Sequence, residues 1–154
     1  MVFAVNKSAK FNYHILDTWE AGLVLTGQEV KSVRGSQITL KDSYVAISGG
    51  AKLGRPQASL LNCHIAPYRY ARVAPGYKPD HSRRLLLHRR DIITIFGQIQ
   101  QKGLTVIPLA VYSKGAKIKV EIALVKGKKQ FDKRETIRRR DLNRDVARQL
   151  KRGA

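Results

Sequence analysis

The chain has 154 residues, of which 30 are Lys or Arg and 11 are Asp or Glu, so its formal net charge is +19. This length predicts one domain with its own core, and so strong a positive charge predicts a polyanionic partner, most readily a nucleic acid. The single cysteine, Cys63, excludes an intrachain disulfide framework and a cysteine-based zinc site. No apolar run is long enough to span a membrane, and the N-terminus lacks the apolar core of a signal peptide. We therefore expect a cytoplasmic monomer without a membrane partner.

The first part of the chain predicts a long strand followed by a short helix. Residues 10–18 alternate loosely between apolar and polar side chains, and the expected strand runs on through residues 23–25 with a bend at Gly22. Thr26 and Glu29 then have the spacing of a capping box, which predicts a helix that continues through Arg34. This spacing gives Glu29 a structural role.

The middle of the chain predicts two strands and one irregular segment. Residues 43–47 and 59–65 are the expected strands, with a turn at 48–50 and a loop between them. Residues 66–84 have no clean period. Tyrosines and basic residues interleave there, a composition that suits stacking on unpaired RNA bases beside charged phosphates. The alternative is a loop whose charge only keeps it in solution.

The last part of the predicted fold consists of one helix and two strands. Apolar residues recur at helical spacing from about His88, and we expect this helix to end at Gly103. Residues 104–112 and 117–125 are the following strands. In the last strand one face is core, and the other meets solvent or phosphate. About six strands with helices at two breaks predict a mainly β fold, a small antiparallel barrel. Small barrels of this kind commonly bind oligonucleotides.

A cationic tail follows the predicted barrel. Residues 126–154 hold 12 of the 30 basic side chains, so we divide the chain into a body, 1–125, and a tail, 126–154. Leu142, Val146 and Leu150 recur at helical spacing in the tail. Because this apolar stripe is thin, we expect little helix in isolation.

The sequence contains no arrangement that predicts catalysis. It has no Gly-rich phosphate-binding loop ending in Gly-Lys-Ser/Thr, and its four histidines lack metal-ligand spacing. Cys63 and His64 are neighbours on an expected strand, so their side chains point to opposite faces and cannot form a nucleophile–base pair. We expect Cys63 to be a small buried residue. Binding without catalysis, cofactor or metal is the favoured interpretation.

Several sequence strings together resemble one family. Residues 20–32 (EAGLVLTGQEVKS), 41–45 (KDSYV) and 126–134 (KGKKQFDKR), with Leu-Leu-Leu-His at 85–88 between them, are similar to bacterial SmpB, the SsrA-binding protein family. The resemblance implies an oligonucleotide-binding (OB-fold) barrel with two or three flanking helices. It implies binding to the tRNA-like domain of transfer-messenger RNA (tmRNA, or SsrA RNA) and delivery of that RNA to stalled ribosomes in trans-translation. It also implies that the tail becomes helical in the empty mRNA channel of the small subunit, near the decoding centre.

The resemblance also implies which residues bind. The tmRNA-binding positions are Glu20, Leu86, His88, Lys7, Lys31 and Arg34. The tail positions for the ribosome and mRNA channel are Lys128, Lys129, Phe131, Asp132, Lys133, Arg134 and Arg138.

Two positions and one rival function stay open at this stage. Phe131 stands where the family usually has His or Tyr; a phenyl ring can stack on a base but cannot hydrogen-bond. Glu20 either accepts hydrogen bonds from base or arginine donors, or pairs with a basic side chain for structure alone. The rival function is that of a ribosomal protein that binds ribosomal RNA, which the composition and the barrel fit equally well.

Overall fold

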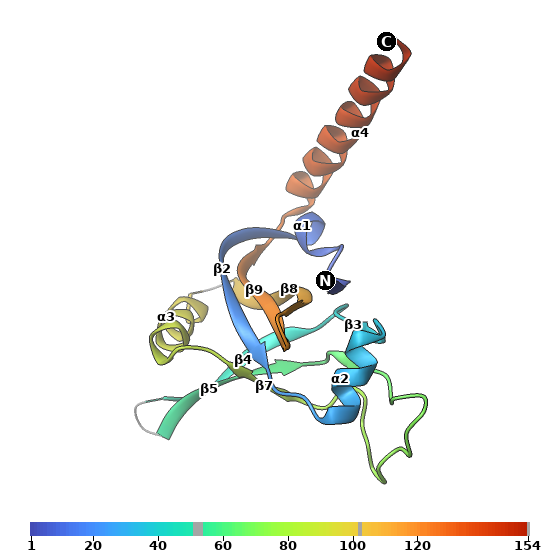
Figure 1. The fold of residues 1–154 in the computed structure, drawn as a ribbon. Coiled ribbons are helices and arrows are strands. Elements are labelled where there is room, and N and C mark those ends of the chain that lie inside the picture. The colour runs from blue at the N-terminus through green and yellow to red at the C-terminus, as the bar shows by residue number, and fades with distance from the viewer. Residues whose placement is uncertain (51–53, 102, 154) are drawn as a thin grey trace.

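The computed structural model describes residues 1–50, 54–101 and 103–153. Nine strands and four helices follow one another along these residues (Figure 1). The strands are β1 (Val2–Val5), β2 (Tyr13–Leu23), β3 (Ile38–Thr39), β4 (Tyr44–Gly50), β5 (Gly54–Leu61), β6 (His64–Ile65), β7 (Arg83–Leu86), β8 (Leu104–Lys114) and β9 (Lys117–Gly127). The helices are α1 (Ala9–Asn12), α2 (Gly27–Arg34), α3 (Arg89–Ile99) and α4 (Gln130–Arg152).

Seven of the strands form one antiparallel sheet that closes on itself. Their order is β1-β8-β4-β5-β7-β2-β9, and a further pairing of β9 with β8 closes the six strands from β8 to β9 into a ring. Strand β1 lies outside the ring on β8, and β3 pairs separately with β6. Helices α1, α2 and α3 flank the barrel, while α4 extends away from it (Figure 1). The predicted fold class, a mainly β barrel of OB-fold type with flanking helices, is confirmed.

The barrel interior follows the alternation of β9. The side chains expected to face the core are buried: Ile118, Val120, Ile122 and Leu124. The opposite face of β9 is not wholly open, because Ala123 is also buried, in a second, smaller core with Ala9 and Ile107. Helix α1 therefore covers this end of the strand, which the alternation of β9 alone did not predict.

Two boundaries in the first half of the chain differ from the prediction. Residues 10–12 belong to α1, whose Asn12 N–H donates to the Ser8 carbonyl at 3.0 Å, and Ala9 anchors this turn in the second core. The break in the pairing of β2 lies between Ile15 and Asp17, at a shift of register with β9, rather than at Gly22.

The predicted turn at 48–50 is part of β4, and Arg55 to Gln57, expected in a loop, belong to β5. Gly49 has a φ of +83° at a register shift between these strands, and a Cβ there would come within 2.9 Å of the Arg55 carbonyl oxygen. The glycine therefore marks a β-bulge inside a longer hairpin. The second predicted strand, 59–65, is divided between β5 and β6.

The third helix and the last strand also differ from their expected ends. Helix α3 ends at Ile99, the last residue that packs on the core, and Gly103 lies in the turn before β8. Strand β9 continues to Gly127, so the first two residues of the predicted tail lie in the sheet.

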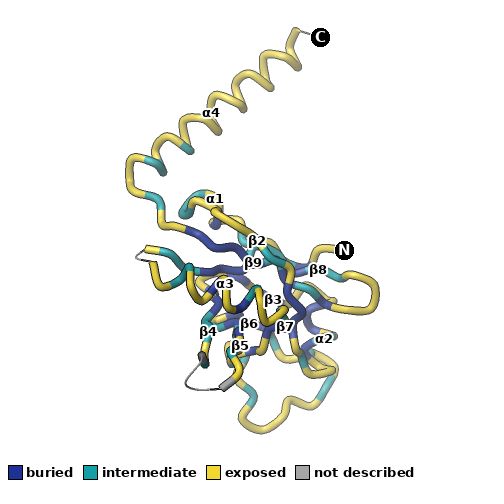
Figure 2. Tube along the Cα trace, turned by 90° about the vertical axis from the view of Figure 1, so that its left-hand side faces the viewer, coloured by how far each residue is buried: buried dark blue, intermediate teal, exposed yellow. Residues whose placement is uncertain are grey.

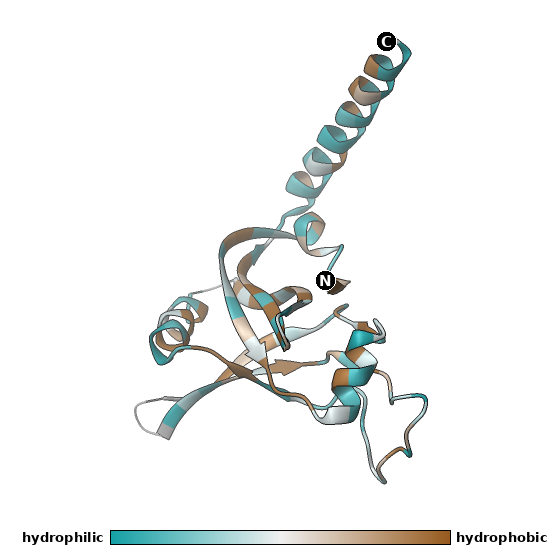
Figure 3. Ribbon diagram, in the orientation of Figure 1, coloured by the Kyte–Doolittle hydropathy of each residue, from teal (hydrophilic) through white to brown (hydrophobic). Residues whose placement is uncertain are grey.

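Helix α4 has no buried residue and projects from the barrel (Figure 2). It is a continuous helix of 23 residues, where we expected little helix outside a complex. Its surface is largely hydrophilic (Figure 3), and the stripe formed by Leu142, Val146 and Leu150 is exposed. No helix among the described residues is long and apolar enough to cross a membrane.

Candidate nucleic-acid interface

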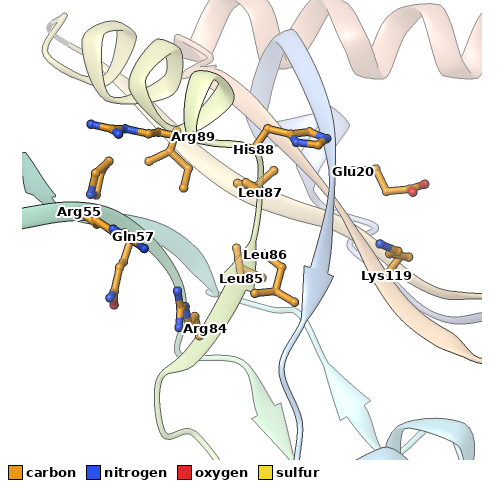
Figure 4. Close-up of a pocket in the computed structure, with 12 residues that line it drawn as sticks. Glu20, Arg55, Gln57, Arg84, Leu85, Leu86, Leu87, His88, Arg89 and Lys119 are labelled. Atoms are coloured by element: carbon orange, nitrogen blue, oxygen red, sulfur yellow. The ribbon is translucent and has the colours of Figure 1, made fainter.

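Three of the six predicted RNA-binding residues line one open cavity of about 640 Å³. Glu20 comes from β2, Leu86 from the end of β7, and His88 from the residue before α3 (Figure 4). We call this cavity the groove. Most of the other polar residues that line it are basic, and the full set is Arg55, Gln57, Arg84, Arg89 and Lys119. The groove thus combines an apolar floor with several positive charges, as a surface for nucleic acid requires.

The alternation of β7 places Leu86 in the groove. Arg83 and Leu85 are buried on the inner face, so Arg84 and Leu86 point outward, and Leu86 is 55% exposed. Gly22 pairs with Leu86 across the sheet, and a Cβ at that glycine would approach the Leu86 Cβ to 3.2 Å. The glycine therefore leaves room for the leucine side chain.

Glu20 is held at the rim of the groove by two partners. The Tyr112 hydroxyl donates a hydrogen bond to its carboxylate, and the Lys114 Nζ lies 3.3 Å from Oε1. The Tyr112 hydrogen bond is the largest cause of a lowered pKa at Glu20, and Lys114 lowers it further. Burial and the bond to Glu20 raise the pKa of Tyr112 to about 12. Glu20 is thus a charged carboxylate, and its remaining lone pairs can still accept bonds from base donors.

His88 occupies the N-cap position of α3. Its carbonyl accepts the Asp91 and Ile92 N–H groups at 3.0 and 3.1 Å, while its ring makes no capping hydrogen bond. Figure 4 shows the ring pointing toward β2. The side chain is exposed and available to a ligand in the groove.

The other three predicted RNA-binding residues lie outside the groove. Lys7 lines a separate cavity beside β3. Lys31, on α2, lies with its Nζ 5.3 Å from the centre of the Tyr68 ring. The Arg34 Nη2, also on α2, donates to the Ala116 carbonyl at 3.4 Å. The structure therefore brings Glu20, Leu86 and His88 together in the groove. The three predicted basic residues lie elsewhere on the protein.

Glu29 has the structural role predicted from the capping box. The box is formed, since Glu29 N–H donates to the Thr26 hydroxyl and the Thr26 N–H donates to Oε2 of Glu29. The same carboxylate pairs with Arg83 at 2.8 Å, and these two side chains are 2% and 0% exposed. His81 also lies 2.6 Å from Oε1. Burial alone would raise the pKa of Glu29, but bonds from Thr26, Arg83 and His81 hold it below its ordinary value.

Arg83 also organises the irregular segment before β7. Its guanidinium donates to the carbonyls of Cys63, at 2.6 Å, and Pro79, at 2.8 Å. The Tyr77 hydroxyl donates to the Ile65 carbonyl at 2.9 Å. The second half of the segment is therefore tied to the barrel.

The tail joins the barrel through the strand end and the first turn of α4. The Lys128 N–H donates to the Asn12 carbonyl at 2.8 Å. Asp132 lies 3.3 Å from the His14 ring nitrogen, and His14 is the main cause of a lowered pKa at Asp132. The Lys133 Nζ lies 5.9 Å from the centre of the Phe11 ring.

The remaining predicted tail residues face solvent or other parts of the tail. The Lys129 N–H donates to Asp132 at 3.3 Å, at the start of α4. Phe131, Arg134 and Arg138 are exposed. The tail motif is therefore divided: Lys128, Asp132 and Lys133 contact the body of the protein, whereas Phe131, Arg134 and Arg138 are exposed to a partner.

Our sequence interpretation missed five polar residues of the groove. Lys119 lies at an outward position of a predicted strand, and its alternation with buried neighbours was the available signal. Arg84 lies on β7, a strand that we did not predict because we assigned residues 66–84 to an irregular segment. Arg89 lies at the start of the predicted third helix, where nothing in the local pattern indicated a role in binding. Arg55 and Gln57 could not be found in this way, because we had assigned them to a loop.

The structure also answers the question raised by Cys63. The thiol is buried, and burial raises its pKa to about 11, whereas His64 is exposed. The prediction of a small buried residue is confirmed. Among the described residues, no three His, Cys, Asp or Glu side chains gather as metal ligands.

Comparisons with known proteins agree with one another. The family model described as "SmpB protein" matches residues 3–152. An SsrA-binding protein of Persephonella marina is 46% identical over 150 residues, covering 97% of this chain and 94% of the relative. One from Gloeothece citriformis is 48% identical over 147 residues, covering 96% and 91%. A solved chain from "tmRNA-SmpB: a journey to the center of the bacterial ribosome" is 35% identical, with a TM-score of 0.67, and the match covers 88% of this chain and 94% of that chain. By sequence and by fold, this chain belongs to the SmpB protein family.

Proposed function

We propose that this chain is an RNA-binding adaptor of trans-translation. It binds the tRNA-like domain of tmRNA and delivers that RNA to stalled ribosomes. The observation that carries the proposal is the groove, where Glu20, Leu86 and His88 lie together in a chain of this family. The adaptor acts in the cytoplasm and binds its partners without catalysing a reaction.

The chemistry of the groove supports RNA as its ligand. Leu86 offers an exposed apolar surface, and the surrounding arginines and Lys119 meet phosphates. Glu20 repels phosphate, so its position favours hydrogen bonds from base amino or imino groups at the rim.

The tail has a separate role in this proposal. Helix α4 enters the empty mRNA channel of the small subunit, and residues 128–138 contact the decoding centre and the channel. Its long, basic and exposed surface supports this role, because ribosomal RNA is a polyanion. Phe131 is exposed at the start of α4. In this proposal its ring stacks on a base of the ribosomal RNA, at the position where the family commonly has His or Tyr.

Binding competition tests the proposal directly. Purified full-length protein is titrated with its own labelled tmRNA at physiological salt, against a ribosomal RNA fragment of equal length. We expect strong preference for tmRNA and an affinity that falls steeply with salt, because phosphate contacts release counterions. Equal affinity for both RNAs would contradict the proposal and favour a ribosomal protein that binds ribosomal RNA.

A further inference from the structure

Two tyrosines and two basic residues form a second surface outside the groove. We call it the tyrosine platform: Lys31 from α2, with Tyr68, Arg69 and Tyr70 from the irregular segment. The two tyrosine rings meet edge to face, with centroids 5.7 Å apart and planes at 71°. Each ring has a cation beside it, Lys31 at 5.3 Å from Tyr68 and Arg69 at 5.8 Å from Tyr70. An open cavity of about 640 Å³ lies against these residues.

The platform is exposed although its backbone is held at several points. Tyr70 is 79% exposed, so most of its surface is open to a ligand although Arg69 and Tyr68 lie beside its ring. The Gln28 side chain donates to the Arg72 carbonyl at 3.3 Å, and the Ala66 N–H donates to the Gln37 carbonyl at 3.1 Å. These bonds fix both ends of the tyrosine-bearing turn, so a ligand would meet rings whose approximate positions are set beforehand.

The chemistry of the platform fits an unpaired nucleotide. A base has a π-face that stacks on an exposed aromatic ring, while its phosphate meets a neighbouring cation. Residues 66–79 contain no Asp or Glu, so the acid of the irregular segment closest in sequence to the tyrosines is Asp80, ten residues beyond Tyr70. The cavity is within the usual size range of small-molecule sites, which is large enough for one nucleotide.

The position of the platform indicates which RNA supplies the nucleotide. The segment that carries it leads directly into β7, which lines the groove. In Figures 1 and 2 this segment lies at the opposite end of the molecule from α4. The platform is thus connected through β7 to the groove, whereas α4, which we propose enters the mRNA channel, lies away from it. We therefore take an RNA seated in the groove as the source of the nucleotide.

We propose that the tyrosine platform binds an unpaired nucleotide of the same tmRNA that occupies the groove, with its base stacked on Tyr70. This inference rests on the proposed function and extends it with a second contact site. Tyr68 packs against the Tyr70 ring edge to face, and Lys31 and Arg69 neutralise the phosphates.

Three substitutions of one exposed residue test the inference. Full-length Tyr70→Phe, Tyr70→Leu and Tyr70→Ala are each titrated with a transcript of the tRNA-like domain of tmRNA. Stacking needs only the ring, so we expect Tyr70→Phe to bind within about twofold of wild type. Tyr70→Leu and Tyr70→Ala should each weaken binding about tenfold, in line with the contribution of one stacked base.

The outcomes separate this inference from the proposed function. Binding by Tyr70→Ala equal to that of wild type overturns the inference, and so does equal binding by the Leu and Phe variants. Equal losses on the tRNA-like domain and on a ribosomal RNA fragment also overturn it, because the platform would then bind any RNA. Failure of the wild type to prefer tmRNA would instead overturn the proposed function. Ultraviolet crosslinking of wild type to the transcript, with peptide mass spectrometry, should place an adduct on Tyr68 or Tyr70.

Discussion

The groove and the tail helix α4 are both expected to bind RNA, but the barrel supports them in opposite ways. The groove residues stand on strands whose inner faces are buried: Leu86 and Arg84 are neighbours of Leu85 and Arg83, which lie in the interior. Helix α4 has no buried residue, and its contacts with the barrel come from its first turn.

This difference has an energetic meaning. Moving a groove residue would disturb buried packing and the buried Glu29–Arg83 pair, so its geometry is set before a ligand arrives. Reorienting α4 would cost only exposed contacts such as His14–Asp132, which stabilise little. A rigid site suits a single RNA fold, and a loosely attached helix suits a channel that it must enter. RNA binding and tail function should therefore be separable by mutation.

The largest expected effect is on stability, when the buried Glu29–Arg83 pair is broken. We call this pair the framework of the groove. Arg83→Met leaves the Glu29 carboxylate buried without its main partner, so we expect a loss of about 3–5 kcal/mol in the free energy of unfolding. Urea or thermal unfolding measures it. Arg84→Met is the matched control, since Arg84 is exposed and should change stability by less than about 0.5 kcal/mol. Equal losses in the two variants would mean that the pair does not support the barrel.

A smaller effect is expected on binding when the groove itself is changed. Leu86→Asp places a negative charge on the apolar floor, where it repels phosphate. We expect the affinity for the tRNA-like domain to fall about ten- to a hundredfold, with stability within about 0.5 kcal/mol of wild type. Ile93→Asp is the control, because Ile93 is 54% exposed, much like Leu86, but does not line the groove. If both variants lose affinity alike, general charge rather than the groove governs binding.

The smallest effect is a pH dependence specific to the framework. The pKa of Glu29 is lower in the folded chain than its ordinary value of 4.5, so the unfolded chain takes up a proton first as pH falls. The stability contributed by Glu29 is complete at neutral pH and is lost as pH falls below about 4.5 and through the folded pKa. Urea midpoints at descending pH should fall more steeply for wild type than for Glu29→Gln. A Glu20→Gln variant should lose less of this slope than Glu29→Gln, because Glu20 is exposed and solvent screens its interactions with Tyr112 and Lys114.

Local signals in the sequence predicted the fold well where the interaction is itself local. The two residues of the capping box, Thr26 and Glu29, are three positions apart, and the alternation of β9 indicates which face is core, so both features could be predicted. The resemblance brought Glu20, Leu86 and His88 forward as a set, and the structure places them in one groove.

Contacts between residues that are far apart in the sequence could not be predicted from local patterns. Glu29 and Arg83 are 54 residues apart, and nothing in either local pattern indicates the partner. Arg55 and Gln57 were missed because Gly49 and Gly50 read as a turn, whereas the sheet uses Gly49 as a bulge. Lys7 lies beside β3, and Lys31 and Arg34 lie on α2; only the tertiary fold separates these basic residues from the groove.

The separation of groove and tail is tested most directly by one titration. Labelled tRNA-like domain is titrated with full-length wild type, with Leu86→Asp, and with a variant in which Asp132, Lys133 and Arg134 are all changed to Ala. Tagging of a stalled nascent chain is measured for the same three proteins. We expect the tail variant to bind within about threefold of wild type, because its three side chains lie outside the groove, and to lose tagging. Loss of RNA affinity in the tail variant as severe as in Leu86→Asp would contradict the account.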